Sequence, residues 1–104
     1  MTRGDVYRVR LPARRGREQR GPRYGVIVQP DALLGLSTAI IAPTSRSAAP
    51  ATFRPEIHVA GDTTRVLVEQ LRAIDLDRLD AHMGRLSPQE QRAVDEAMEL
   101  VLGL

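Results

Sequence analysis

YGVIVQ at residues 24–29 and STAIIA at residues 37–42 are the stretches of sequence that decide the fold. Both runs are short, apolar and rich in β-branched residues, and Pro30 and Gly35 stand between them. This pattern predicts two buried strands joined by a turn-rich connection. A sheet is therefore expected to form the centre of the molecule.

Upstream of these runs, residues 5–11 alternate between apolar and charged side chains. Such alternation predicts a half-buried first strand, with Tyr7, Val9 and Leu11 on one face and Arg8 and Arg10 on the other. Residues 12–22 are rich in Arg, Gly and Pro, so we expect a long exposed loop there. Loops of this length usually cost order unless they serve binding.

Downstream, short apolar runs alternate with turn-forming residues. The pattern predicts further strands with exposed connections, and a short helical turn capped by Asp75. The expected elements are a loop at 44–55, strands at 56–59 and 64–68 around a hairpin turn at 60–63, an edge strand at 70–74, and the helical turn at 75–79.

The C-terminus carries a strong helix signal. Ser87 is an N-cap residue, Pro88 suits the first helical position, and Glu90 completes a capping box. An apolar stripe then recurs at helical spacing and consists of Val94, Ala97, Met98, Val101 and Leu102. The sequence therefore predicts a mainly β protein with α (α+β), forming a single domain over residues 1–104 with an aliphatic core and a C-terminal helix that packs on the sheet or on a partner.

Composition limits the environment of the chain. The absence of Cys excludes disulfides and thiolate metal sites. The first residues lack a targeting pattern and no apolar run is long enough to span a membrane, so we expect a cytoplasmic protein with no membrane association. A chain of 104 residues buries a marginal fraction of its surface, which makes self-association a reasonable expectation.

Charge is segregated along the chain. Residues 1–23 hold eight Arg against Asp5 and Glu18, a net of +6, and the remaining residues hold seven Arg against eleven carboxylates, a net of −4. All fifteen basic residues are Arg, whose planar guanidinium binds phosphate through two donors. The clustering indicates a polyanionic ligand.

Several catalytic arrangements are absent from the sequence. His58 and His82 have neither a second His at helical spacing nor a nearby carboxylate cluster, so we expect neither a metal nor another cofactor. His58 lies between two apolar strand residues and is expected to face solvent, and the same is expected of His82. The sequence also lacks a phosphate-binding glycine loop and a nucleophile elbow.

Residues 16–23 end with Arg23, which stands where the predicted loop enters a strand. A catalytic cation must be fixed relative to the phosphate it serves, and this position would fix it. From the residues alone two interpretations stay open with about even weight: a catalytic arginine, or a solvated loop beside a structural arginine.

An ordered set of motifs resembles the MazF/PemK toxins over nearly the whole chain. The motifs are Arg3-Gly4-Asp5-Val6-Tyr7, Gly16-Arg17-Glu18-Gln19 with Gly21 and Arg23, Pro43-Thr44, the run from Val68 to Asp75, Arg78-Leu79, and Gly84-Arg85-Leu86-Ser87. This chain departs from the family in having Tyr24 where the family usually has Pro after the arginine. Tyr24 lacks the fixed φ of Pro, which bears on how rigidly Arg23 is presented.

The resemblance implies a small SH3-like barrel of the PemK/CcdB type with a C-terminal helix. It also implies a homodimeric toxin that cuts single-stranded RNA without a metal, leaving a 2′,3′-cyclic phosphate and a 5′-hydroxyl, with messenger RNA as substrate and transfer or ribosomal RNA as further candidates. A cognate antitoxin would inhibit it. By resemblance Arg23 and Thr44 are catalytic, and the expected RNA-binding residues are Arg14, Arg15, Arg17, Glu18, Gln19, Arg20, Ser45 and Arg46.

Two alternatives stay open at the level of sequence. One is a CcdB-like toxin on the same barrel, which poisons gyrase and cuts nothing. The other is a non-catalytic RNA-binding relative in which Tyr24 has disabled the chemistry. RNA cleavage by the purified protein separates both from the nuclease.

Overall fold

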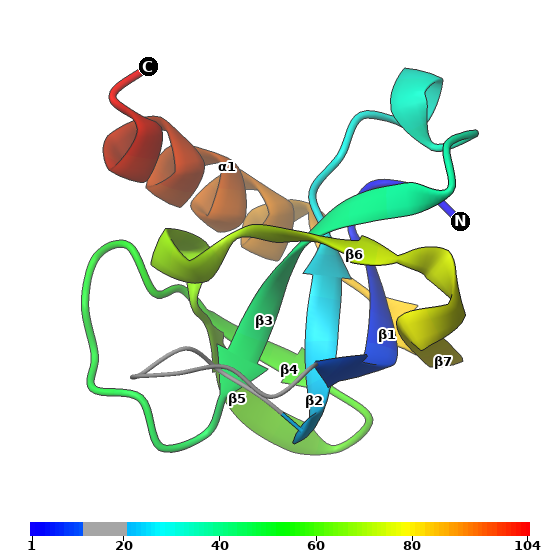
Figure 1. The fold of residues 1–104 in the computed structure, drawn as a ribbon. Coiled ribbons are helices and arrows are strands. Elements are labelled where there is room, and N and C mark those ends of the chain that lie inside the picture. The colour runs from blue at the N-terminus through cyan, green and yellow to red at the C-terminus, as the bar shows by residue number, and fades with distance from the viewer. Residues whose placement is uncertain (12–20) are drawn as a thin grey trace.

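The computed structural model describes residues 1–11 and 21–104. In these residues an antiparallel sheet of seven strands curls below a single α-helix, α1 (Pro88–Leu102), which closes the chain (Figure 1). The strands are β1 (Asp5–Leu11), β2 (Gly21–Ile27), β3 (Thr38–Ser45), β4 (Glu56–Val59), β5 (Asp62–Val66), β6 (Arg72–Asp75) and β7 (Leu79–Arg85). Three 3₁₀ turns, η1 (Asp31–Leu33), η2 (Val68–Gln70) and η3 (Leu76–Arg78), connect them.

The sheet follows the order β4-β5-β3-β2-β1-β7, and β6 also pairs with β3. Strand β3 is central because its two halves have different neighbours on one edge. Its first half, from Thr38 to Ile41, pairs with β6, while Thr44 and Ser45 pair with β5. The sheet therefore divides at β3 and curls, as Figure 1 shows.

The core lies on both faces of this sheet. Val26 and Ile27 are successive residues of β2, so their side chains point to opposite faces, and both are fully buried. Val26 belongs to a cluster that α1 completes with Val94 and Ala97, and Ile27 belongs to a second cluster with residues of β1, β3 and β6. Burial on both faces explains why residues 24–29 form a continuous apolar run.

The predicted fold class is confirmed. The chain folds as a mainly β protein with α, and the first strand and the strand at 56–59 have the predicted bounds. The capping box of α1 is also present: the Ser87 hydroxyl accepts from the Glu90 backbone N–H at 3.1 Å, and Glu90 accepts from the Ser87 N–H at 2.8 Å. In the apolar stripe, Val94 and Ala97 are buried against the sheet, and Leu102 at the helix end is 52% exposed.

Strand β3 extends beyond its predicted end. The loop expected at 44–55 begins only after Ser45, because Thr44 and Ser45 form backbone pairs with Val66 and Arg65 of β5. Strand β2 likewise begins at Gly21 through pairing with Leu11, inside the segment expected to be loop, and it ends at Ile27 instead of the expected residue 29. Both extensions arise from pairing with strands far away in the sequence. The remainder of the predicted first loop, 12–20, lies outside the described residues.

The hairpin turn is shorter than the four residues expected. Val59 pairs with Asp62, and the two residues between them, Ala60 and Gly61, have φ of 50° and 81°. Positive φ at both central residues is the geometry of a type I′ turn, which matches the twist of the flanking strands. Strand β5 therefore occupies 62–66 instead of the predicted 64–68. Separately, β6 occupies 72–75 instead of the predicted 70–74.

Strand β7 was not predicted. Its side chains are mostly half-buried or exposed, so they do not show the alternation by which an edge strand is recognised. The strand exists because it pairs with β1. The helical turn before it is present as η3, but the Asp75 side chain makes no capping hydrogen bond, so its predicted capping role was wrong.

No helix among the described residues has the length and apolar character needed to cross a membrane.

Candidate functional site

A polar pocket of about 260 Å³ opens beside the first residues of β2 and the last residues of β3. Figure 1 places these strand ends on the side of the sheet remote from α1. The pocket is lined by Arg8, Arg23, Tyr24, Thr44, Ser45, Arg46, Asp62 and Thr64.

The sheet register brings these residues together. Arg8 on β1 lies opposite Tyr24 on β2, and the backbone carbonyl of Tyr24 accepts a hydrogen bond from the Thr44 hydroxyl of β3 at 3.2 Å. Strand β5 adds Asp62 and Thr64 from beyond the type I′ turn. Four strands, β1, β2, β3 and β5, thus contribute side chains to one pocket. Strand pairing fixes the positions of these side chains.

Arg23 presents an unsatisfied donor. The residue is half-buried on β2, and its Nε is buried without a hydrogen-bond partner among the described residues. A buried donor without a partner costs free energy, which an anionic ligand oxygen would recover. Arg23 also lines the pocket, so its positive charge is available to an anionic ligand there.

Thr44 is held tightly. It is 2% exposed, and because its hydroxyl donates its proton to the Tyr24 carbonyl, its oxygen lone pairs remain able to accept a hydrogen bond. Ser45 is also buried, and its hydroxyl lies 3.2 Å from that of Ser47. Both predicted hydroxyls thus line the pocket from the rigid end of β3.

Tyr24 connects several parts of the pocket. Its hydroxyl donates to Asp62 Oδ2 at 2.8 Å, and the Arg8 guanidinium lies 5.8 Å from the centre of its ring. The hydrogen bond to Asp62, together with burial and the negative charge of Asp62, raises the pKa of Tyr24 above its usual value. The hydroxyl is therefore neutral at physiological pH and serves as a donor.

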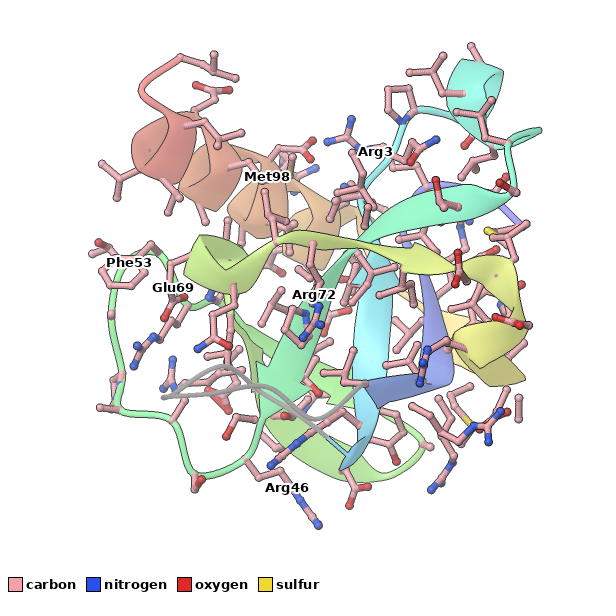
Figure 2. The ribbon with its side chains drawn as sticks, in the orientation of Figure 1. Arg3, Arg46, Phe53, Glu69, Arg72 and Met98 are labelled. Atoms are coloured by element: carbon pink, nitrogen blue, oxygen red, sulfur yellow. The ribbon has the colours of Figure 1, made fainter. Side chains whose placement is uncertain are left out.

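Arg46 marks the open side of the pocket. Its Nη1 lies 3.5 Å from Asp62 Oδ1, and its side chain is 72% exposed. Figure 2 shows it at the edge of the molecule, directed away from α1. With Arg8, Arg23 and Arg46 against Asp62 alone, the pocket lining is positively charged. Such a lining suits a phosphate-bearing ligand.

The structure brings four of the predicted site residues together: Arg23, Thr44, Ser45 and Arg46. The other predicted RNA-binding residues, Arg14, Arg15, Arg17, Glu18, Gln19 and Arg20, lie outside the described residues.

Sequence reasoning missed three residues that line the pocket: Arg8, Asp62 and Thr64. Arg8 was assigned correctly to the polar face of the first strand, but only the register with β2 shows that it faces Tyr24. Asp62 was assigned to a turn and Thr64 to the start of a strand. No local signal links either of them to Arg23.

Both histidines are exposed, as predicted, and neither lines this pocket. His58 Nδ1 lies 3.0 Å from the Thr63 hydroxyl, and His82 Nε2 lies 3.4 Å from Asp5 Oδ1. In the part of the chain that the structure describes, no three His, Cys, Asp or Glu side chains group so as to hold a metal ion.

Comparison with known sequences gives consistent matches. A family model described as PemK-like, MazF-like toxin of type II toxin-antitoxin system matches residues 2–102. The chain is 43% identical over 104 residues to the protein named "Putative toxin Rv3098A/RVBD_3098A" of Mycobacterium tuberculosis, across 98% of this chain and 97% of the relative. It is 32% identical over 111 residues to Endoribonuclease MazF of Staphylococcus saprophyticus, across 100% and 92% of the two chains.

Solved structures share the fold. MazF (Form-I) of Deinococcus radiodurans aligns with a TM-score of 0.88 at 20% identity, across 100% of this chain and 97% of that one. An endoribonuclease from a mycobacterial species, solved in complex with its cognate antitoxin, aligns with a TM-score of 0.86 at 19% identity, across 100% and 96%. The family match over almost the whole length, together with the two sequence relatives, shows that this chain belongs to the PemK-like, MazF-like toxins of type II toxin-antitoxin systems.

Proposed function

We propose that this protein is a toxin that acts as a metal-independent, sequence-specific endoribonuclease on single-stranded RNA. The observation that carries the proposal is the convergence of Arg23 and Thr44, from two strands, on one pocket that also holds Arg8 and Arg46. The Staphylococcus saprophyticus relative, which aligns with 100% of this chain, is named an endoribonuclease. Messenger RNA is the expected substrate.

The proposed reaction is an internal transfer at phosphorus. The ribose 2′-oxygen attacks the adjacent phosphorus and loses its proton, the bond from phosphorus to the 5′-oxygen breaks, and that oxygen gains a proton. The products are a 2′,3′-cyclic phosphate and a 5′-hydroxyl. The protein must orient the nucleophile and stabilise charge that grows on the phosphoryl oxygens.

Arg23 suits the second requirement. Its guanidinium stays protonated at any physiological pH, so it acts through charge and hydrogen bonds instead of taking the proton from the nucleophile. Because Arg23 lines the pocket, its guanidinium can donate to a phosphoryl oxygen there. We assign Arg23 to transition-state stabilisation.

Thr44 suits the first requirement. Since its proton is donated to the Tyr24 carbonyl, the hydroxyl oxygen is oriented to accept a hydrogen bond from the 2′-hydroxyl. This favours the orienting role over donation to the phosphate. Ser45 and Arg46 are assigned to the RNA backbone, where an exposed arginine contributes to affinity more than to chemistry.

The proposal includes the partners that the family implies. We expect a homodimer of one-domain protomers in the cytoplasm, inhibited by a cognate antitoxin whose acidic segment covers the arginine-lined pocket. A mycobacterial endoribonuclease with this fold has been solved in complex with its antitoxin. The positive lining of the pocket fits such a segment as well as it fits RNA.

The decisive experiment is incubation of the purified protein with a mixed RNA in the presence of a chelator, followed by mapping of the 5′-hydroxyl ends. Discrete ends at a recurring sequence are expected. If the RNA stays intact in this assay while expression of the protein in cells still arrests growth, a toxin of the gyrase-poisoning kind is favoured instead.

Arg23 is tested by Arg23→Ala, for which we expect a loss of about a hundredfold or more in cleavage rate with the fold retained. Arg92→Ala is the matched control, because Arg92 is an exposed arginine of α1 that does not line the pocket. Both variants lose one positive charge. Equal rates for the two variants would show that Arg23 has no special part in the reaction.

A further inference from the structure

Asp62 is the one carboxylate among the described residues that line the arginine-rich pocket. A carboxylate accepts hydrogen bonds but cannot donate them, and it repels a phosphate placed against it. Its presence therefore weakens phosphate binding at this spot. A different part of the RNA is expected to lie next to it.

The carboxylate is held in one orientation. Tyr24 donates to Oδ2 at 2.8 Å, and Arg46 Nη1 lies 3.5 Å from Oδ1. Asp62 also begins β5 directly after the two-residue turn, where its backbone pairs with Val59. Its side chain nevertheless remains 36% exposed, so each oxygen keeps lone-pair capacity for a ligand. This arrangement forms a rigid acceptor at the pocket wall.

Thr64 supplies a second polar group on the same wall. It lies two residues after Asp62 on β5, and alternate residues of a strand share a face. Its hydroxyl oxygen has no hydrogen-bond partner among the described residues although the side chain is buried, and Thr64 lines the pocket. A buried hydroxyl without a partner is costly, and a ligand acceptor would remove that cost.

Unstacked bases are read in RNA along their Watson–Crick and Hoogsteen edges. Guanine carries two adjacent donors, N1–H and N2–H₂, beside one acceptor, O6. Adenine, cytosine and uracil each place a donor directly beside an acceptor, so a carboxylate meets an acceptor that it repels. Two acceptor oxygens with a hydroxyl donor nearby therefore complement guanine better than any other base.

We propose that Asp62, positioned by Tyr24, determines sequence specificity by accepting hydrogen bonds from guanine N1–H and N2–H₂, with Thr64 donating to O6. The inference rests on the proposed RNA cleavage and names the base that this wall of the pocket recognises. The phosphates lie toward the arginines, and the base lies toward β5. In this arrangement Arg46 faces a phosphate, and Asp62 faces the base.

The test maps cleavage ends in a mixed RNA for the wild type, Asp62→Asn and Asp77→Asn. Asp77 is an exposed carboxylate of η3 that does not line the pocket, so its variant controls for the lost charge. We expect guanine at one fixed position for the wild type and Asp77→Asn. In Asp62→Asn the preference for guanine over the other bases should fall by about tenfold.

A second readout replaces that guanine with inosine, which lacks only the N2 amino group. The wild type is expected to cleave the inosine RNA about tenfold more slowly, because a hydrogen bond to a charged acceptor is lost. Asp62→Asn should distinguish the two RNAs less. If Asp62→Asn does not fold, Tyr24→Phe keeps the test available, because it releases the carboxylate without removing it and should weaken the preference.

The outcomes separate this inference from the proposed function. Cleavage at sequences without a fixed guanine, or an unchanged preference in a folded Asp62→Asn, would overturn the assignment of Asp62 and leave the nuclease standing. A wild-type protein that binds RNA and produces no ends would overturn both.

Discussion

Tyr24 contacts residues of three other strands that line the pocket. Its carbonyl accepts from Thr44, its ring lies near the Arg8 guanidinium, and its hydroxyl donates to Asp62. Proline, which the family usually has at this position, would restrict φ but would offer neither the ring nor the hydroxyl. In this chain the local geometry beside Arg23 is held by side-chain contacts.

At the residue scale, Thr44→Val tests the orienting role of the hydroxyl. Valine keeps the shape of the side chain but cannot accept a hydrogen bond, so we expect kcat to fall by about a hundredfold while KM changes little. Thr44→Ser is the matched variant and should retain most of the activity. Steady-state cleavage of one RNA over a range of concentrations measures kcat and KM for both variants. Equal loss in the two variants would point to packing instead of the hydroxyl as the cause.

At the scale of elements, Asp5 joins the N-terminus to β7. Its carboxylate accepts from the Thr2 backbone N–H at 2.8 Å and from Arg85 at 3.0 Å, and His82 lies 3.4 Å away. Burial alone would raise the pKa of Asp5, but the hydrogen bonds from Thr2, His82 and Arg85 outweigh it and lower the pKa below its usual value. An edge strand with little apolar surface is thus held partly by charge.

This lowered pKa predicts acid sensitivity. The unfolded chain binds a proton at Asp5 before the folded chain does, so the stabilisation is present above the unfolded pKa of about 4 and is lost as pH falls through the folded value. Asp5→Asn should cost about 1–3 kcal/mol of unfolding free energy at neutral pH and less in acid. Urea unfolding at about pH 7 and about pH 3 measures this. A constant difference between the two pH values would contradict the linkage.

At the scale of the whole molecule, two arginines from the basic start of the sequence meet a third arginine at one site. Arg8 and Arg23 come from the strongly basic first 23 residues, and Arg46 joins them from the end of β3. A surface of this kind attracts a polyanion, and the attraction is screened by salt. The affinity for RNA should therefore depend steeply on ionic strength.

Arg46→Ala tests this dependence in a binding measurement at several salt concentrations. The ligand is a single-stranded 2′-O-methyl RNA of mixed sequence, which lacks the nucleophile and so is not cleaved. The slope of log affinity against log salt should become shallower by about 0.7, the contribution of one phosphate contact. Arg92→Ala has the same net charge and should keep the wild-type slope. Matching slopes in the two variants would mean that net charge alone, and not the pocket, attracts RNA.

Local sequence patterns determined much of this fold. The alternation over residues 5–11, the apolar run at 24–29 and the capping box at Ser87 each involve interactions between near neighbours in the chain, so their structures could be predicted. Arg23 and Thr44 were recognised through motifs in matching order, and both line the pocket. Their catalytic roles stay predictions.

Tertiary structure alone decided the rest. Strand β7 exists through its pairing with β1, and β3 reaches Ser45 because β5 pairs with it there. Arg8, Asp62 and Thr64 entered the pocket through the register of strands that are distant in sequence. The physical reason is that strand pairing is satisfied by backbone groups common to all residues, so side-chain patterns predict where strands occur but only weakly predict which strands pair and in what register.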